Sequence, residues 1–482
     1  MLPFCCPLWF FCSLLFFCLL LVGSQIFLKF AANFIKFLNQ MTLKLKKGLD
    51  LALEGAVGPD STVKNVEPVT CAVVPDDFPG FTPKLDVKEG DTVEVGSPLM
   101  HDKACPDLRL VSPVSGKVKT VVRGERRKIL RVVVENDRKA TAARFDTSLP
   151  VASLLAQSGL LAMIRRRPFD VVADPTRTPR DIFVTAMDTA PLAVSPAASL
   201  GKDAPEALAA AVKALATLTA GKVYISHGAD WKFGPVPGAG MIGVEGPHPA
   251  GNVGIQIANI APINKGETVW ALDIVTLYKI GRLLLTGEVD PRVTVAVTGP
   301  EVSDPALVAT VAGADIKALT AGRLKDDGRH QRIISGNVLT GTAVSEADGY
   351  LRWPYRQVTV IAEGDDVDEF MGWASVAPSK MSVHSALPLH GLRRLFSPDA
   401  RLNGGRRAMI MSGEYDKVLP MDVMAEYLLK AILSHNIDDM EALGIYEVAP
   451  EDLALCEFVD TSKLPVQQIV RDGLDYLRKE TE

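Results

Sequence analysis

Residues 87–127 constrain the fold most, because short runs of β-branched residues alternate there with residues that favour tight turns. The β-branched runs in and just after this stretch cover residues 93–95, 117–122 and 129–134. Gly90, followed by Asp91, and Gly116, preceded by Ser115, stand where turns are needed. The pattern predicts a small two-layered β-domain. Such domains either carry a swinging prosthetic group or only dock other proteins, and the sequence of this stretch leaves both open.

The first 40 residues differ in composition from the rest of the chain. They contain nine of the 18 phenylalanines and four of the seven cysteines. Residues 8–22 are apolar and long enough to span a bilayer, and Lys29 and Lys36 after them would keep the remainder in the cytoplasm. We interpret residues 1–40 as a start codon assigned too far upstream, with Met41 as the native start. The alternative is a genuine membrane anchor.

The part of the chain from Met41 onward is long enough for several domains. The whole chain has 52 basic and 57 acidic residues, a net charge of −5, which argues against a nucleic-acid partner. Beyond residue 40 only Cys71, Cys105 and Cys456 remain, far apart and without a Cys-x-x-Cys pair. This spacing predicts a reducing compartment, no disulfides and no iron–sulfur cluster held by this chain alone.

A pattern of alternating strands and helices follows the β-rich part. Residues 181–186 and 223–226 read as buried strands, and residues 151–164 and 207–218 as helices. Asp203 is placed to cap the second helix, with Pro205 in its first turn and Gly221 at its end. This alternation predicts an α/β layer with a mostly parallel sheet.

The last third of the chain returns to strands and then ends in helices. Residues 293–297, 332–341 and 357–361 predict a third, compact β-containing domain. Apolar residues then recur at helical spacing, the first group after Pro420. The two groups are Met424, Tyr427, Leu428, Ala431 and Ile432, and Ile469, Val470, Leu474 and Leu477.

A glycine motif is the main candidate for a cofactor site. Gly238, Gly240 and Gly243 have the spacing of a dinucleotide-binding loop, in which glycines let backbone N–H groups approach a pyrophosphate. Prolines precede the motif where a buried strand should lie, and prolines flank His248 where a helix should begin. We interpret the motif as a surface loop with, at most, a vestigial ligand site that includes His248 and Gly251.

Two other candidate sites have simpler interpretations. Lys103 stands where the attachment lysine of a lipoyl domain would lie, but Pro106 and the residues around it lengthen the expected hairpin. His384 and His390 are spaced too far apart for a helical metal pair and have no acid nearby. We predict no metal site and no catalytic residues in this chain.

From Met41 onward the chain resembles a known family over nearly its whole length. The resemblance rests on KGLDL at 47–51, RGERR at 123–127, RPF at 167–169, FVTAMDT at 183–189, GPHPAG at 246–251, SG at 335–336, RAM at 407–409 and EDLALC at 451–456. These phrases are similar to those of the A subunit of the bacterial sodium-translocating NADH:quinone reductase. That family is related to the flavoprotein subunit of complex I and to the C subunit of the Rnf complex.

The resemblance implies a multidomain α/β and β fold. The expected parts are an apolar extension (1–40), a barrel-sandwich, lipoyl-like domain (41–140), a Rossmann-like α/β domain (141–290), a β-grasp domain of the SLBB type (291–365) and a helical C-terminus (366–482).

The resemblance also implies a function. The chain would be a peripheral, cytoplasmic subunit without a redox cofactor, in a complex with five other subunits (B to F), most directly the membrane-embedded B subunit. That complex uses FAD, FMN, riboflavin and a [2Fe–2S] cluster to pass electrons from NADH to ubiquinone, and ubiquinone is a candidate ligand of this subunit. The family commonly has a second cysteine where this chain has Asp460, which weakens any role for Cys456. The competing interpretation is an independent carrier, with a flavin or with lipoylated Lys103.

Overall fold

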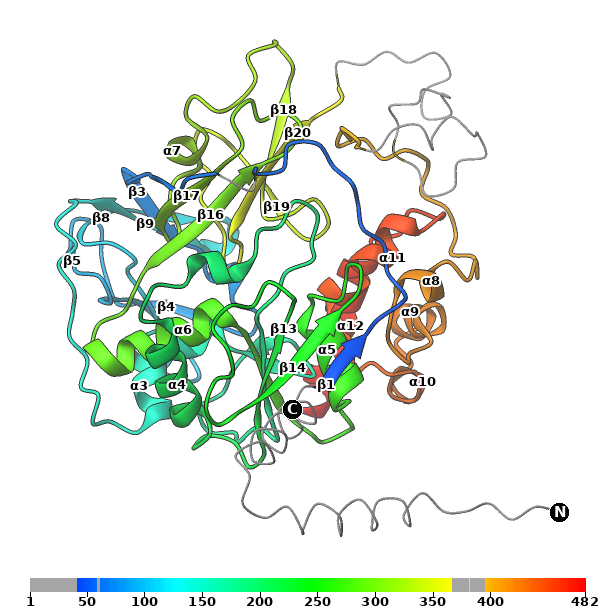
Figure 1. Cartoon of the computed structure of the whole chain (residues 1–482), viewed down its shortest axis with the longest axis horizontal. Coiled ribbons are helices and arrows are strands. Elements are labelled where there is room, and N and C mark those ends of the chain that lie inside the picture. Colours follow the sequence, from blue (N-terminus) through cyan, green and yellow to red (C-terminus); the bar gives the residue numbers. More distant parts are fainter. Residues whose placement is uncertain (1–40, 59–60, 366–380, 382–394) are drawn as a thin grey trace, which may run out of the picture.

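The computed structural model describes residues 41–58, 61–365, 381 and 395–482. Four β-sheets, of seven, six, four and three strands, form most of this part of the protein. In Figure 1 strands β5, β8 and β9 lie on the left, and helices α8 to α12 gather on the right. Within the described ranges no helix combines the length and the apolar character needed to cross a membrane.

The barrel-sandwich part consists of the two smaller sheets. The four-stranded sheet has the order β3-β9-β8-β5 and the three-stranded sheet the order β4-β6-β7, all antiparallel. The strands are β3 (Thr70–Val73), β4 (Pro83–Leu85), β5 (Thr92–Val93), β6 (Pro98–Asp102), β7 (Arg109–Val111), β8 (Gly116–Arg123) and β9 (Ile129–Asn136). Gly116 has φ 147°, and a Cβ there would lie 1.8 Å from the Glu135 carbonyl oxygen, so β8 and β9 need a glycine to approach here.

The seven-stranded sheet forms the α/β part and has the order β1-β14-β13-β12-β15-β10-β11. Its first five strands are parallel, β10 runs antiparallel to β15, and β11 runs antiparallel to β10. The strands are β1 (Met41–Lys44), β10 (Arg165–Arg167), β11 (Val171–Val172), β12 (Ile182–Thr185), β13 (Val223–His227), β14 (Ala239–Glu245) and β15 (Val269–Asp273). The associated helices are α3 (Val151–Gln157), η3 (Leu161–Met163), η4 (Pro196–Ser199), α4 (Ala204–Leu215), α5 (Val253–Ile260) and α6 (Ile274–Thr286). The expected mostly parallel sheet is confirmed.

The six-stranded sheet has the order β19-β18-β20-β16-β17-β2. Its strands are β2 (Lys64–Asn65), β16 (Arg292–Thr298), β17 (Ala306–Val311), β18 (Gln331–Ser335), β19 (Thr342–Val344) and β20 (Gln357–Ala362). Helix α7 (Ile316–Thr320) lies between β17 and β18 in the sequence. The chain before the barrel-sandwich part therefore contributes to two other sheets, because β1 pairs with β14 and β2 pairs with β17.

The C-terminal part contains α8 (Tyr415–Val418), α9 (Ala425–Leu433), α10 (Ile437–Ala442), η7 (Pro450–Leu453), α11 (Ala454–Val459) and α12 (Val466–Thr481). Side chains of these helices share a buried core with Ile242 and Val244 of β14. The four apolar residues predicted on the last helix are all buried. Two expectations for α9 are wrong: it begins five residues after Pro420, and Met424 and Tyr427 are exposed while Leu428, Ala431 and Ile432 face the core.

Two predicted helix boundaries also need correction. The helix expected over 151–164 ends at Gln157, because the chain turns at Gly159, which has φ 78° and packs against Val111. Asp203 does not cap α4 with its side chain. Its carboxylate instead accepts hydrogen bonds from Tyr278 Oη (2.6 Å) and Arg282 Nη1 (2.5 Å) of α6, and α4 ends at Leu215, well before Gly221.

The interpretation of residues 238–243 as a surface loop is wrong. Gly240 and Gly243 lie within β14, which pairs on both sides, with β13 and with β1. Glycine fits here because neighbouring side chains lie close: a Cβ on Gly240 would be 3.0 Å from the Tyr224 ring, and one on Gly243 3.3 Å from Thr42 Oγ1. The motif therefore serves strand packing.

Candidate functional site

A cavity of about 350 Å³ lies where the direction of strand addition reverses in the seven-stranded sheet. From β12 the chain adds β13 and β14 on one side and then returns through α5 to add β15 on the other side. Thr185, at the end of β12, and Asp273, at the end of β15, both line the cavity. Ligands of open α/β sheets bind at such a position. We call this space the switch-point cavity.

Arg167, which lines the switch-point cavity, belongs to a buried ion pair. Arg167 of β10 donates from Nη2 to Asp452 Oδ2 of η7 at 2.8 Å, and their side chains are 1% and 0% exposed. Gly254 of α5 makes room for the pair, since a Cβ there would lie 2.1 Å from Asp452 Oδ2. Burial acts to raise the pKa of nearby Asp170, but Arg165, Arg167 and a third arginine outweigh it and lower that pKa. The pair thus ties the sheet to the C-terminal helices.

Two of the five predicted vestigial-site residues reach this cavity. His248 and Gly251 line it, whereas the strand residues Gly240 and Gly243 do not. His248 is 3% exposed, and burial lowers its pKa to about 4 despite the acids nearby. Thr189 Oγ1 accepts from the Gly251 N–H (2.9 Å) and lies 3.1 Å from His248 Nδ1. Nε2 of the neutral ring has no hydrogen-bond partner among the described residues.

Gly238, the first of the five, lies just before β14 and away from the switch-point cavity as well. The glycine spacing therefore does not form a phosphate-binding loop. The cavity is instead bordered by charged side chains from β10, from the C-terminal part and from the segment before β20.

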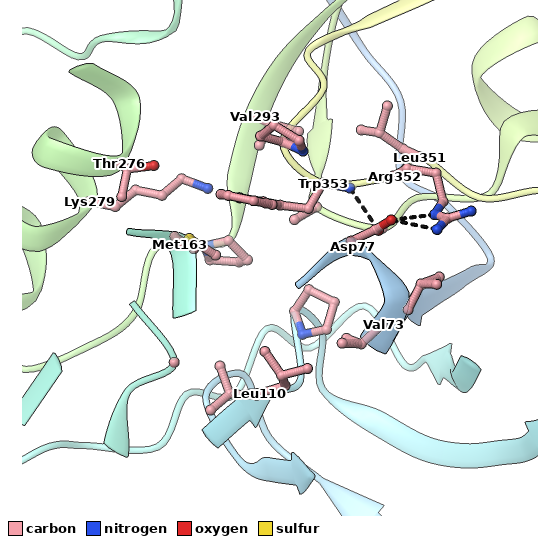
Figure 2. A pocket seen from close by; sticks show the side chains of 18 of the residues that line it. Val73, Asp77, Leu110, Met163, Thr276, Lys279, Val293, Leu351, Arg352 and Trp353 are labelled. Carbon is pink, nitrogen blue, oxygen red and sulfur yellow. Dashed lines mark hydrogen bonds and ion pairs between the residues drawn. The ribbon is translucent and has the colours of Figure 1, made fainter. Parts of the chain in front are cut away.

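A second cavity, of about 110 Å³, lies where the barrel-sandwich, α/β and six-stranded parts meet (Figure 2). Its volume is smaller than the roughly 150 Å³ of a cavity that accommodates a benzene ring. Most of its wall is apolar. The wall includes Val73, Phe78 and Leu110 from the barrel-sandwich part, Met163 and Val275 from the α/β part, and Val293, Leu351 and Trp353 from the third part. We call it the apolar cavity.

Trp353 forms the wall between the two cavities and is held from several sides. Its ring stacks on Phe78, with centroids 5.1 Å apart and planes inclined by 20°, and the Arg165 guanidinium lies 4.6 Å from the ring centre. The Asp77 carboxylate accepts hydrogen bonds from the backbone N–H of Trp353 (3.0 Å) and from Arg352 Nε (2.6 Å). Burial raises the pKa of Asp77 even though these donors act to lower it.

Three cations line the apolar cavity: Arg352 and Arg356, which are paired with Asp77 and Asp273, and Lys279 of α6. The Lys279 side chain is 6% exposed, and within the part of the chain that the structure describes no hydrogen bond or ion pair joins its amine. Burial lowers the Lys279 pKa to about 8, although Asp290 and Asp273 oppose this. Those two acids are already bound to other cations, Asp290 to Arg292 and Asp273 to Arg356, each at 2.5 Å.

The Lys279 amine points toward the Trp353 ring (Figure 2). Lys279 and Asp290 also line a wider cleft of about 760 Å³ that adjoins the apolar cavity. A planar aromatic ligand with a carbonyl oxygen would find an aromatic wall, an ammonium donor and an opening for a substituent here. Most binding pockets combine an apolar lining with a few such polar groups.

The other predicted positions lie elsewhere. Lys103 is exposed on the connection between β6 and β7, and Asp102 braces that connection by accepting the Ala104 and Cys105 N–H groups at 2.8 and 2.9 Å. Cys71 and Cys456 are buried and Cys105 is half-buried, with no disulfide among them. Residues 1–40, His384 and His390 lie outside the described residues. Within the part of the chain that the structure describes, no cluster of three or more metal-ligating side chains occurs.

Three family models match consecutive parts of the chain. They are described as the NqrA N-terminal barrel-sandwich hybrid domain (residues 43–137), the NqrA second alpha/beta domain (147–289) and the NQRA C-terminal domain, of the SLBB type (294–346). The A subunit of the Na(+)-translocating NADH-quinone reductase of Serratia proteamaculans (strain 568) is 38% identical over 453 residues, which cover 91% of this chain and 100% of that protein. The chain belongs to this family. The barrel-sandwich, α/β and SLBB expectations are thereby confirmed.

Other relatives agree with this assignment. The A subunits of the same reductase in Yersinia pestis bv. Antiqua (strain Angola) and Neisseria meningitidis serogroup C (strain FAM18) are 37% and 36% identical, with 91% of this chain and 100% of each relative covered. Among solved structures, an NAD+-reducing [NiFe]-hydrogenase chain matches with 15% identity, 39% coverage of this chain, 41% of that chain and a TM-score of 0.26. A likeness this weak carries no argument.

Sequence reasoning missed Lys279, Asp77 and Trp353. Lys279 is a single lysine on helix α6. Its neighbours in the cavity are distant in the sequence, because Asp77 lies about 200 positions before it and Trp353 about 70 positions after it. A lysine in the middle of a buried helix, between Tyr278 and Ile280, was the available signal.

Proposed function

We propose that this chain is the peripheral A subunit of a sodium-pumping NADH:quinone reductase on the cytoplasmic face of a bacterial inner membrane. The other five subunits, B to F, would be its partners, and the membrane-embedded B subunit the most direct one. Membership of the family over the full length of its relatives supports this assignment. The Rossmann-like character of the α/β part and a separate helical C-terminal domain belong to the same proposal.

We further propose that the apolar cavity receives the head group of ubiquinone. The single observation that carries this is a buried ammonium, on Lys279, that points toward an aromatic side chain in a mostly apolar space. A quinone ring would lie against the edge of the Trp353 ring, whose faces contact Phe78 and Arg165, and one carbonyl oxygen would accept a hydrogen bond from the amine. Charge-assisted hydrogen bonds of this kind are about twice as strong as neutral ones. The isoprenoid tail would leave through the adjoining cleft.

In this proposal the chain shapes the site and carries no redox group. FAD, FMN, riboflavin and the [2Fe–2S] cluster would belong to other subunits, where NADH is oxidised. The Lys279 charge would favour the growth of negative charge on the quinone oxygen as electrons arrive from a partner. The three cysteines, which are far apart in the sequence, and the glycines that serve strand packing are consistent with a chain that shapes the site and transfers no electrons.

The second candidate is an independent carrier, and the switch-point cavity favours its flavin form. Its volume and its position in the sheet suit a mononucleotide. A stoichiometric absorbance band near 450 nm in purified protein would support this alternative and contradict the cofactor-free proposal. Lys103 is exposed, as a lipoylated lysine must be, so intact mass tests the acyl-carrier form.

The test of the quinone proposal is photolabelling in the assembled complex. A photoreactive ubiquinone analogue should label this chain near residues 73–78 or 351–356, which line the apolar cavity. Lys279→Met should lower that labelling about 10-fold, the effect of losing one charge-assisted hydrogen bond. Lys213→Met, at an exposed position on α4, is the matched control and should leave it unchanged. Label confined to other subunits, or unaffected by Lys279→Met, would contradict the proposal.

A further inference from the structure

The tip of the β8–β9 hairpin gathers a group of exposed cations. Lys84 of β4 and five residues of the hairpin, four of them basic, line a groove of about 520 Å³ between the two sheets of the barrel-sandwich part. The cations are Lys84, Arg123, Arg126, Arg127 and Lys128, which we call the basic hairpin. No acidic residue lines this groove, although the chain as a whole has a net charge of −5. Positive charge is thus concentrated along this groove, and exposed Glu125 is an acidic residue of the same tip that does not line it.

Most of these charges are unused within the described residues. Lys128 pairs with Asp76 at 2.7 Å, and Arg123 Nη1 donates to the Arg127 carbonyl oxygen at 3.2 Å. For Arg126, and for the side chains of Lys84 and Arg127, the described part of the chain offers no hydrogen bond or ion pair. The guanidinium groups of Arg126 and Arg127 are therefore available to an outside partner.

The backbone of the hairpin tip is strained in a way that its sequence does not relieve. Arg126 has φ 52° and Arg127 has φ 61°, so two consecutive non-glycine residues adopt the left-handed conformation. Glycine or asparagine adopts this conformation at less cost. Residues held in this conformation tend to cluster at functional sites. The two arginines are the side chains that the strained turn displays.

Apolar groups stand beside the charges. Leu130 is 37% exposed and contacts Gly124 in the tip, and Pro83 and Leu85 line the groove with the cations. Arginine and lysine next to exposed leucine suit the interface of a membrane, where the apolar group reaches the acyl boundary and the cations meet phosphates. Strand β8 also lies at the outer edge of the molecule, away from the C-terminal helices (Figure 1).

We propose that the basic hairpin binds the phosphate groups of anionic phospholipids and so holds this part of the chain on a membrane surface. The planar guanidinium matches a phosphate with two parallel hydrogen bonds, which a lysine cannot offer. The inference rests on the proposed function, because it requires a chain that works at a membrane. It adds a direct lipid contact to the contacts with partner subunits.

Vesicle flotation tests the proposal with the purified full-length chain. The chain should float with phosphatidylcholine vesicles that contain about 30% phosphatidylglycerol, and raising the salt concentration should release it. Arg126→Gln/Arg127→Gln should weaken this binding about 30-fold. The control Lys202→Gln/Lys213→Gln removes the same charge from exposed positions near α4 and should change binding less than about 3-fold.

A second variant separates binding from folding. Arg126→Asn/Arg127→Gly suits the left-handed turn and should be at least as stable as the native chain while it loses the same binding. Equal flotation with purely phosphatidylcholine vesicles, which attraction through residues 1–40 would produce, would overturn the proposal. Capture by an acidic protein segment but not by vesicles would also overturn it. If the chain does not bind anionic vesicles but still co-purifies with membrane subunits, the lipid proposal is wrong and the proposed function stands.

Discussion

Replacing Lys279 with methionine should stabilise the protein at neutral pH. Burial lowers the pKa of this amine from 10.5 to about 8, so the folded state holds the charged form at a cost. Each pKa unit corresponds to about 1.4 kcal/mol, which makes the cost about 3 kcal/mol below pH 8. Methionine has a similar length, no charge and a flexible apolar side chain, so Lys279→Met should gain most of that free energy.

The pH dependence of this effect has a definite sign. Below pH 8 the amine is protonated in both the folded and the unfolded chain, and the full cost is present. Between pH 8 and 10.5 only the unfolded chain keeps the proton, so the native protein gains stability as the pH rises. The advantage of Lys279→Met in free energy of unfolding should therefore shrink from about 3 kcal/mol at pH 7 to about 1.4 kcal/mol at pH 9.5.

Urea unfolding followed by tryptophan fluorescence at the two pH values measures this difference. Lys213→Met, on the exposed side of α4, is the control and should change stability by less than about 0.5 kcal/mol at both pH values. A Lys279→Met variant that is less stable than the native chain at pH 7, or equally stabilised at both pH values, would refute the reasoning. It would mean that the amine is paired or solvated in the folded protein.

Three further predictions concern the core of the molecule. Asp452→Ala should lower the free energy of unfolding, measured in urea titrations, by about 3–5 kcal/mol, because it leaves the Arg167 charge buried without a partner. The control Lys265→Met, in an exposed ion pair, should lower it by less than about 1 kcal/mol. Similar losses in the two variants would contradict this prediction. Gly254→Ala should lower the melting temperature by several degrees, since its Cβ would meet Asp452 Oδ2 at 2.1 Å, and an unchanged melting temperature would show that the helix shifts freely. Among the three thiols of the described residues, peptide maps should show that an alkylating reagent labels Cys105 first. The reason is that burial raises the pKa of Cys71 and Cys456 further than that of Cys105. Equal labelling of the three thiols would argue for local opening of the fold.

Patterns local in sequence predicted much of the fold. The β-branched runs after Gly90 and Gly116 became strands β5, β8 and β9 of the four-stranded sheet, and the strands expected at 181–186 and 223–226 lie side by side and parallel. The helical spacing of Ile469 and Leu477 placed both in the core. These signals work because the alternation of buried and exposed positions is set within a few residues.

Contacts between distant residues explain what the sequence could not predict. Asp203 looked like a cap, but Tyr278 and Arg282 compete for its carboxylate from another helix. Gly240 looked like part of a loop because prolines stand on both sides of the motif. The sequence did not show that Gly240 packs against the Tyr224 ring. The apolar cavity likewise depends on three parts of the chain that meet around one tryptophan, and no local spacing encodes that meeting.

The central claim is that this subunit shapes a quinone site in its apolar cavity without transferring electrons itself. Steady-state kinetics of the assembled complex with Lys279→Met tests this most directly. We expect the KM for a short-chain ubiquinone to rise about 10-fold or more, while NADH oxidation with an artificial electron acceptor stays unchanged. An unchanged quinone KM, or an equal loss of both activities, would contradict the claim.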